Sequence, residues 1–296
     1  MKRYLYTTLV LLITFGSCQT VVDADKLLDT EEKVHIVGFL SPSDTVLRVN
    51  VSKALPSIGT PLPANDYEAF REAFLIKNAQ VQIRDGFGNQ TSLVYVDTLE
   101  TYLADAATLS IESEQEYFLE VTVDDKTYSA SCRIPLEVGE IDHEISTRIS
   151  AFDETIGVIK FRFQDFADEK NFYMLGGLYK VNFTYEDQEP TDAIGSLYFD
   201  TDQFLTDNIS NGGTIGGNGE FYIGSGVEIN NASVTLQVAH MEEIIFQQMR
   251  TDDLNFDAEG NPFVEYAIAP NNFLDEGAVG VFAGYTITEK EIELDF

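Results

Sequence analysis

The sequence predicts a mainly β protein with a short helix in its second half. Apolar and polar residues alternate with period two in many short segments, which is the pattern of strands with one buried face. Gly, Asn, Asp and Pro residues that favour turns separate these segments. Only residues 241–250 repeat their apolar positions convincingly at helical spacing. The length of 296 residues suits two domains, or one large β domain, with an ample core.

The first 18 residues have the three parts of a lipoprotein signal. Lys2 and Arg3 supply the positive start, and 4–15 is an apolar run too short to span a bilayer as a free transmembrane helix. Gly16 and Ser17 are small residues that let a signal peptidase approach the backbone before Cys18. We expect the signal peptide 1–17 to be removed and Cys18 to be lipidated. An ordinary secretory signal or an N-terminal anchor helix is the alternative.

Residues 18–33 are polar and acidic, which predicts a tether between the lipid and the fold. Asp23 and Asp25 follow the cysteine, where acidic residues act as a surface-export signal in some bacteria. A solvated linker is the alternative interpretation. Both interpretations place the start of the folded part near residue 34.

Charge and cysteine content restrict the possible partners and the means of stabilisation. The chain has 18 basic and 50 acidic residues, and removing Lys2 and Arg3 with the signal leaves a net charge of −34. Such a surface repels nucleic acid and anionic lipid. Cys18 and Cys132 are the two cysteines of the chain, so lipidation of the first leaves no intrachain disulfide. Stability must then come from burial, with 14 Tyr and 21 Phe as the main aromatic material.

The first domain is predicted over 34–136. Leu47, Val49 and Val51 share one face of a strand, and the proline-rich segment 56–63 interrupts the pattern. Asp66 is the expected N-cap of a short helix over 66–74.

The clearest hairpin of the sequence spans 117–134. Alternating apolar residues over 117–123 and 128–134 flank Asp124-Asp125, a two-residue turn that tolerates left-handed backbone. Cys132 falls on the inward face, which favours a small buried hydrophobic residue over a nucleophile or metal ligand.

The second domain is predicted over 137–296, after a boundary at 135–139. Alternation resumes at 159–163, 179–185 and 234–238. The glycine-rich segment 212–226 is interpreted as a flexible loop, except that Glu220-Phe221-Tyr222-Ile223 has the pattern of a strand. Because a strand and not a helix follows the glycines, a phosphate-binding loop is disfavoured.

A helix is expected where Met241, Ile244, Ile245 and Met249 recur at helical spacing. The next segment, 253–258, begins like a calcium-binding EF-hand loop, but Ala258 and Val264 replace the Gly and Glu that such a loop needs. We interpret 253–258 as a connection from helix to strand and leave loose calcium binding open.

The C-terminal alternation of Val279, Val281, Ala283 and Tyr285 predicts a closing strand. Gly280 and Gly284 on its other face leave room for a neighbouring backbone to approach closely.

Motifs spread along the chain carry a resemblance to a known family. They are the hairpin at 117–134 with Lys126-Thr127-Tyr128-Ser129-Ala130, Asp165 with Asn171-Phe172-Tyr173, Gly260-Asn261-Pro262-Phe263, Asn272, and Gly280-Val281-Phe282-Ala283-Gly284-Tyr285. They resemble an uncharacterised domain-of-unknown-function family of Bacteroidota outer-membrane lipoproteins, often encoded beside TonB-dependent transporters. The resemblance implies an immunoglobulin- or transthyretin-like β-sandwich followed by a second β-rich domain. It carries no catalytic residues.

The sequence gives little support to an enzyme. His35, His143 and His240 have no local partner pattern, and no zinc-protease, serine-hydrolase or Cys-x-x-Cys motif occurs. A carboxylate pair for glycoside hydrolysis can still hide among 50 acidic residues. We therefore expect a protein that is not an enzyme and has no cofactor.

The expected function is that of an accessory lipoprotein. On the resemblance, it is anchored by lipid in the outer membrane, faces the cell exterior, and captures a ligand for a TonB-dependent transporter or docks on one. The alternative is a stand-alone adhesin or glycan-binding module. Segments 56–63 and 212–226 are the candidate contact loops.

Overall fold

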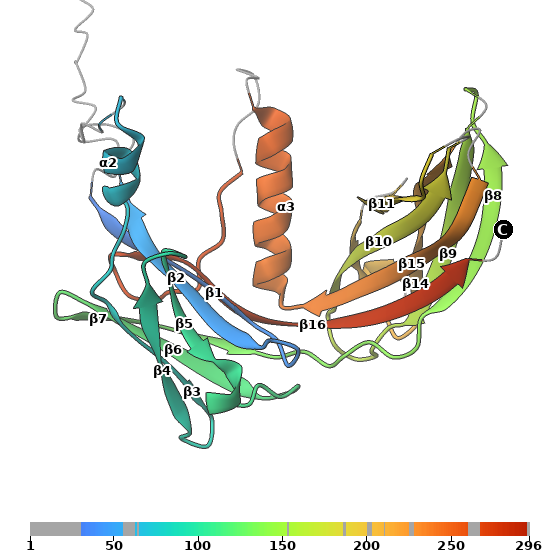
Figure 1. The fold of residues 1–296 in the computed structure, drawn as a ribbon. Helices are drawn as coiled ribbons and strands as arrows, with labels where there is room; N and C mark the ends of the chain where they lie inside the picture. Colours follow the sequence, from blue (N-terminus) through green and yellow to red (C-terminus); the bar gives the residue numbers. More distant parts are fainter. Residues whose placement is uncertain are drawn as a thin grey trace, which may run out of the picture.

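The computed structural model describes residues 31–55, 63, 65–152, 154–185, 188–199, 203–209, 211–224, 228–259 and 267–294. The prediction of a mainly β protein is confirmed: the described residues form a 12-stranded sheet and a 4-stranded sheet. The signal, Cys18, the segment 56–62 and the motif 260–263 lie outside the described residues. Two β units lie side by side, and strand β16 runs through both of them (Figure 1).

The first unit curls a run of strands around one core. In spatial order the run is β1-β2-β5-β4-β3-β6-β7, and the start of β16 flanks β1. Its elements along the chain are β1 Lys33–Leu40, β2 Val46–Ala54, α2 Tyr67–Glu72, β3 Gln80–Asp85, β4 Gln90–Val96, β5 Thr101–Asp105, the 3-10 turn η2 Ala106–Thr108, β6 Glu116–Val123 and β7 Lys126–Arg133. The predicted inward residues Leu47 and Val49 are fully buried, which confirms the strand and its register.

The hairpin of the first unit agrees with the sequence prediction. Strands β6 and β7 pair in antiparallel register from Glu116–Arg133 to Val123–Lys126. Asp124 and Asp125 both have positive φ, at 46° and 67°, as a tight two-residue turn requires. Cys132 is 3% exposed, so its predicted burial is confirmed.

The short helix α2 has the predicted N-cap. The Asp66 carboxylate accepts a hydrogen bond from the Ala69 amide at 3.1 Å, which satisfies one free donor of the first turn. The helix ends at Glu72, two residues earlier than expected, and buries no side chain.

The second unit packs two sheets face to face. One has the order β11-β10-β15-β16 and the other β12-β14-β9-β8. Its elements are β8 Asp142–Ile149, β9 Thr155–Gln164, β10 Phe172–Thr184, β11 Thr191–Ser196, β12 Tyr198–Phe199, β13 Phe204–Thr206, the 3-10 turn η3 Asp207–Ile209, β14 Thr214–Gly224, β15 Glu228–Met241 and α3 Glu243–Ala258. Phe161 and Phe163 from β9 meet Val234 and Leu236 from β15 in the core between the sheets.

The flexible-loop interpretation of 212–226 is wrong for residues 214–224. This segment is strand β14, paired with β9 along its length. A Cβ at Gly216 would overlap the Phe161 carbonyl oxygen, and one at Gly217 would lie 2.5 Å from a Leu175 methyl group. The glycines therefore allow close packing within a strand, and the Glu220–Ile223 part of the prediction is confirmed.

The predicted helix exists but is longer and begins later. Helix α3 has 16 residues, and Met241 belongs to the end of β15. The interpretation of 253–258 as a connection is wrong, because this segment forms the last turns of α3. Asn255 holds these turns: its side chain accepts from the Ala267 amide at 2.7 Å and donates to the Ala267 carbonyl at 3.1 Å. A calcium loop starting at Asp253 is therefore not formed.

Strand β16, Ala278–Leu294, joins the two units through 17 residues. Residues 278–284 pair in parallel with β1, and residues 285–294 pair in antiparallel register with β15. A Cβ at Gly280 would overlap the Ile36 carbonyl oxygen, and one at Gly284 would lie 2.6 Å from the Arg133 carbonyl oxygen. The expected close backbone approach is confirmed. The boundary at 136/137 remains a prediction, but the first core also takes Phe273 and Phe282 from the C-terminal part.

Candidate functional site

The linker between the two units, residues 134–141, runs along β16 and is held by side chains of that strand. Polar side chains at alternate positions of β16 donate to carbonyl oxygens of the linker. These bonds are Thr286 to Leu136 at 3.0 Å, Thr288 to Val138 at 2.7 Å and Lys290 to Ile141 at 2.6 Å. The period of two places all three donors on one face of the strand. The linker is therefore fixed to the same strand that both units share.

A cleft of about 420 Å³ opens at this junction. Its wall comes from the end of β7, the linker, segment 166–172 and the chain around the start of α3. The cations at its rim are paired: Lys170 lies 2.8 Å from Glu243, and Arg133 lies 4.0 Å from Glu114. The rim therefore carries both positive and negative side chains.

His240 lies in the floor of the cleft with an oxygen acceptor at each ring nitrogen. Its Nδ1 lies 2.8 Å from the Leu136 carbonyl oxygen, and its Nε2 lies 3.1 Å from Asn171 Oδ1. Asn171 Nδ2 donates to the Phe166 and Glu169 carbonyl oxygens, which directs Oδ1 toward the imidazole. Burial lowers the pKa of His240, which favours the neutral ring at neutral pH, and the single N–H of that ring can donate to one of these two oxygens at a time.

Beside His240, Tyr173 and Asp165 form a buried pair. The Tyr173 hydroxyl donates to Asp165 Oδ1 at 2.5 Å, and the Gly212 amide donates to Oδ2 at 2.8 Å. Burial, together with the bond to Asp165, raises the pKa of Tyr173 far above its ordinary value. The phenol therefore stays protonated and serves as a donor that orders the segment before β10.

Two side chains close the gap between β7 and β16. Glu242 accepts from the Arg133 amide at 3.1 Å and from the Gly284 amide at 2.6 Å. Asn272 donates to the Ser131 carbonyl at 3.3 Å and to the Phe282 carbonyl at 2.7 Å, and it accepts from the Phe282 amide at 3.0 Å. Each side chain thus supplies hydrogen bonds that a paired strand would otherwise supply. The Arg133 amide and the Ser131 carbonyl at the edge of β7 therefore have partners, although β7 does not pair directly with β16.

The ionisable side chains of the junction suit a structural role, and the junction is called the joint below. Burial raises the pKa of Glu242 despite the two amide bonds that lower it. Burial also raises the pKa of Cys132 well above its ordinary value, so its sulfur is a thiol and not a nucleophilic thiolate. In the described part of the chain, no group of three His, Cys, Asp or Glu residues is placed to hold a metal ion.

A family model matches residues 20–291 of the chain, and its description is a domain of unknown function, DUF4249. The chain belongs to the DUF4249 family. No curated protein matches it. Among solved structures it is similar to a chain named "Biofilm associated protein - B domain", at 7% identity over 87% of this chain and 86% of that chain, with a TM-score of 0.18. This likeness is too low to carry an argument. Among the described residues of this DUF4249 protein, no helix is long and apolar enough to cross a bilayer.

Several of the residues that suggested the family lie at or near the junction, whereas the motif 260–263 is outside the described residues. Asp165 and Asn171 order the floor of the cleft, Asn272 joins β7 to β16, and Gly280 and Gly284 allow β16 to pass close to its neighbours. In this DUF4249 chain Asn272 and Gly284 join β7 to β16, and the other residues order the segments on either side.

Helix α3 begins at the junction and projects away from it between the two units (Figure 1). Its first turns are packed, with Ile245 and Phe246 each 4% exposed. Its far half carries Leu254 at 51% and Phe256 at 75% exposure. A hollow of about 420 Å³, the α3 groove, lies beside it and is lined by Leu197, Tyr198, Phe199, Gln203, Phe204, Arg250, Asp253 and Leu254. The far half of α3 and this groove therefore present exposed apolar side chains.

The sequence predicted some of the residues at the junction and in its surroundings. Cys18 lies outside the described residues, so its lipidation stays a prediction. Of the candidate contact loops, 56–62 also lies outside them, and 214–224 is a strand. Glu242 and His240 were missed as joint residues, because their partners are far away in sequence and no local spacing marks them.

Proposed function

We propose that this DUF4249 protein is a non-catalytic outer-membrane lipoprotein that binds a TonB-dependent transporter, either to dock on it or to deliver a ligand. The observation that carries the proposal is helix α3, which is fixed at its base and bears exposed Leu254 and Phe256 at its far half. A helix that leaves apolar side chains uncovered is a common form of partner-binding element.

The chemistry of the junction supports a binding role over a catalytic one. An oxygen acceptor lies at each ring nitrogen of His240, Glu242 is held by two backbone amides, and Asp165 is held by Tyr173 and Gly212. Glu242 thereby joins the two units, and His240 and Asp165 order the part of the second unit beside it. A rigid joint presents α3 in a fixed position, which lowers the entropic cost of binding a partner.

The position of α3 suits a partner that is itself in the membrane. The described chain begins at residue 31, just before β1, and the start of β1 lies opposite the end of β2. Figure 1 shows α2 and the far end of α3 on one side of the molecule. A lipid on Cys18 would hold this side near the membrane surface. The tether would then raise the effective concentration of α3 near an integral partner without a strong intrinsic contact.

Affinity isolation from outer membranes in mild detergent tests the proposal. We expect the wild-type lipoprotein to recover a β-barrel transporter, and the Leu254→Gln/Phe256→Gln variant to lose it, since glutamine removes apolar surface but keeps helix propensity. Val94 and Phe87 are 68% and 78% exposed on the first unit, so Val94→Gln/Phe87→Gln is the matched control and should retain the transporter. Recovery of the wild type alone under several gentle conditions would contradict the proposal.

The stand-alone glycan-binding module remains the second candidate because of one observation. Tyr198 lines the α3 groove and is 69% exposed, so its ring is available to stack on a sugar. A glycan array with the soluble protein separates the two functions. Binding that Tyr198→Ala abolishes, without any recovered transporter, would favour the module.

A further inference from the structure

Helix α2 leaves Tyr67 mostly exposed and Phe70 partly exposed. Tyr67 is 73% exposed and Phe70 is 38% exposed, and the helix buries no residue. Leu99, in the adjacent turn between β4 and β5, is 58% exposed. An ordinary surface helix turns its apolar face to the core, so this arrangement points to a contact outside the chain. Tyr67, Phe70 and Leu99 are called the α2 tip below.

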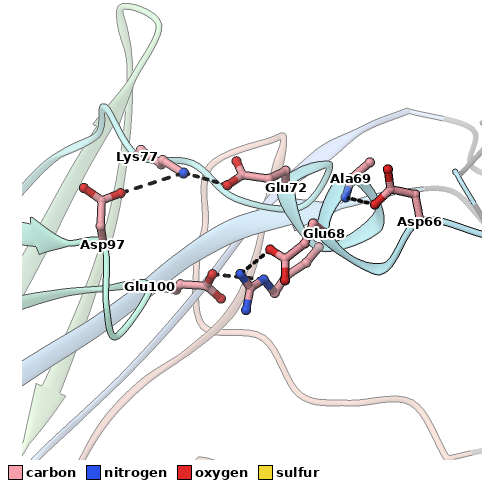
Figure 2. Close-up of polar contacts among 8 residues, drawn as sticks. Asp66, Glu68, Ala69, Glu72, Lys77, Asp97 and Glu100 are labelled. Atoms are coloured by element: carbon pink, nitrogen blue, oxygen red, sulfur yellow. Dashed lines mark hydrogen bonds and ion pairs between the residues drawn. The ribbon is translucent and has the colours of Figure 1, made fainter.

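The two cations near the α2 tip, Arg71 and Lys77, are paired with carboxylates (Figure 2). Arg71 lies 2.7 Å from Glu68 and 3.1 Å from Glu100, which ties the helix to the turn that carries Leu99. Lys77 lies 2.9 Å from Glu72 and 3.8 Å from Asp97. Both cations are thus engaged by carboxylates. The α2 tip therefore has little electrostatic attraction for an anionic surface, and its affinity must come from apolar contact.

Lys53 connects the α2 tip with the start of the folded chain. Its backbone amide donates to the Phe74 carbonyl oxygen just after α2 at 2.8 Å, and its ammonium group lies 3.0 Å from Glu32. The point where the tether enters the fold is therefore next to α2. The 13 steps from Cys18 to Glu31 span at most about 45 Å when fully extended. If Cys18 carries a lipid, as the proposed function holds, the α2 tip stays within reach of the bilayer.

We infer that the α2 tip is a membrane contact that inserts Tyr67, Phe70 and Leu99 into the interface of an uncharged lipid surface. Aromatic side chains favour this zone, where the ring is in an apolar environment and a polar group can remain hydrated. The position of the α2 tip, next to the point where the tether enters the fold, favours the bilayer over a protein partner. The acidic chain argues against anionic lipid.

The absence of tryptophan from the sequence allows a direct test. The mature chain is made with Cys132→Ala, so that Cys18 is the single thiol, and it is coupled there to a maleimide lipid in phosphatidylcholine vesicles. Tyr67→Trp places a reporter in the α2 tip. Phe87→Trp is the matched control, because Phe87 is 78% exposed in the turn that follows β3, at the end of the strand away from α2. Chemical coupling makes the result independent of whether cells lipidate Cys18 and of any transporter.

We expect Tyr67→Trp emission to shift to the blue and to be quenched by brominated acyl chains, with neither change for Phe87→Trp. Adding Phe70→Ser and Leu99→Ser should weaken the partition of the uncoupled chain roughly tenfold, as the loss of two small apolar contacts predicts. Anionic phosphatidylglycerol should not strengthen it. Unquenched Tyr67→Trp on a coupled, folded chain would overturn the inference. So would a blue shift that appears only with purified transporter, since the α2 tip would then be a protein contact.

Discussion

The carboxylate of Glu242 accepts the backbone amide of Arg133 at 3.1 Å, although the two residues are 109 positions apart. The other carboxylate oxygen accepts the Gly284 amide at 2.6 Å. One side chain at the base of α3 therefore joins the last strand of the first unit to the strand that both units share. The joint is held by side-chain bonds where a sheet would normally supply backbone bonds.

Glu242→Gln should destabilise the protein, because glutamine can accept only with its carbonyl oxygen. One of the two amides would then face an NH₂ group and lose its partner, which costs about 1–3 kcal/mol when the donor is buried. The free energy of unfolding in urea measures the effect. Glu243→Gln is the control, since Glu243 forms an exposed pair with Lys170, and such pairs contribute at most about 1 kcal/mol. Equal losses in both variants would contradict the role of Glu242.

The same residue predicts a pH dependence of stability. Burial raises the pKa of Glu242 above 4.5, so the folded state holds its proton at a pH where the unfolded state has released it. Between these two pKa values unfolding releases a proton, and the free energy of unfolding therefore falls as the pH rises. The stability difference between the wild type and Glu242→Gln should accordingly decrease from pH 4.5 upward and then level off. A difference that increases over this range would show the opposite shift.

Gly280→Ala should be among the most damaging single-methyl substitutions in the chain. Gly280 has φ of +135°, and an added Cβ would overlap the Ile36 carbonyl oxygen of the paired strand β1. We expect a loss of about 3 kcal/mol or more, because strain and backbone collision act together. Gly139→Ala is the control, since a Cβ there has no atom within 4 Å and should change stability by at most about 1 kcal/mol. Thermal unfolding of both variants measures the two losses of stability, and equal losses would contradict the prediction.

Local features of the fold were predictable from the sequence, and the joint was not. The turn at Asp124-Asp125, the Asp66 cap and the inward register of Cys132 depend on neighbouring residues and periodicity. The parallel pairing of β16 with β1 joins Val34 to Ala278, and no local pattern encodes that choice of partner. The loop interpretation of β14 was wrong because glycine is common both in loops and in strands where a neighbouring segment packs closely.

Cys132 should resist thiol reagents until the protein unfolds. It is 3% exposed, and burial raises the pKa of its thiol, so both access and thiolate formation are suppressed. Cys132→Ala should be mild, whereas Cys132→Asp should prevent stable folding because it buries a charge without a partner. Labelling followed by mass spectrometry, with and without urea, provides the measurement. Rapid labelling of the native protein would contradict the buried register.

Cys18→Ser should abolish lipidation and release the protein from the membrane. A hydroxyl group cannot replace the thiol as the acyl acceptor, so the precursor should remain uncut or be cut elsewhere. Mass spectrometry of the mature N-terminus tests this directly, and fractionation of cells shows where the chain resides. Cys132→Ala is the control, because it also removes one of the two cysteines but leaves the signal intact. An unmodified Cys18 in the purified wild type would refute the lipid anchor, and with it the tethered search for a membrane partner.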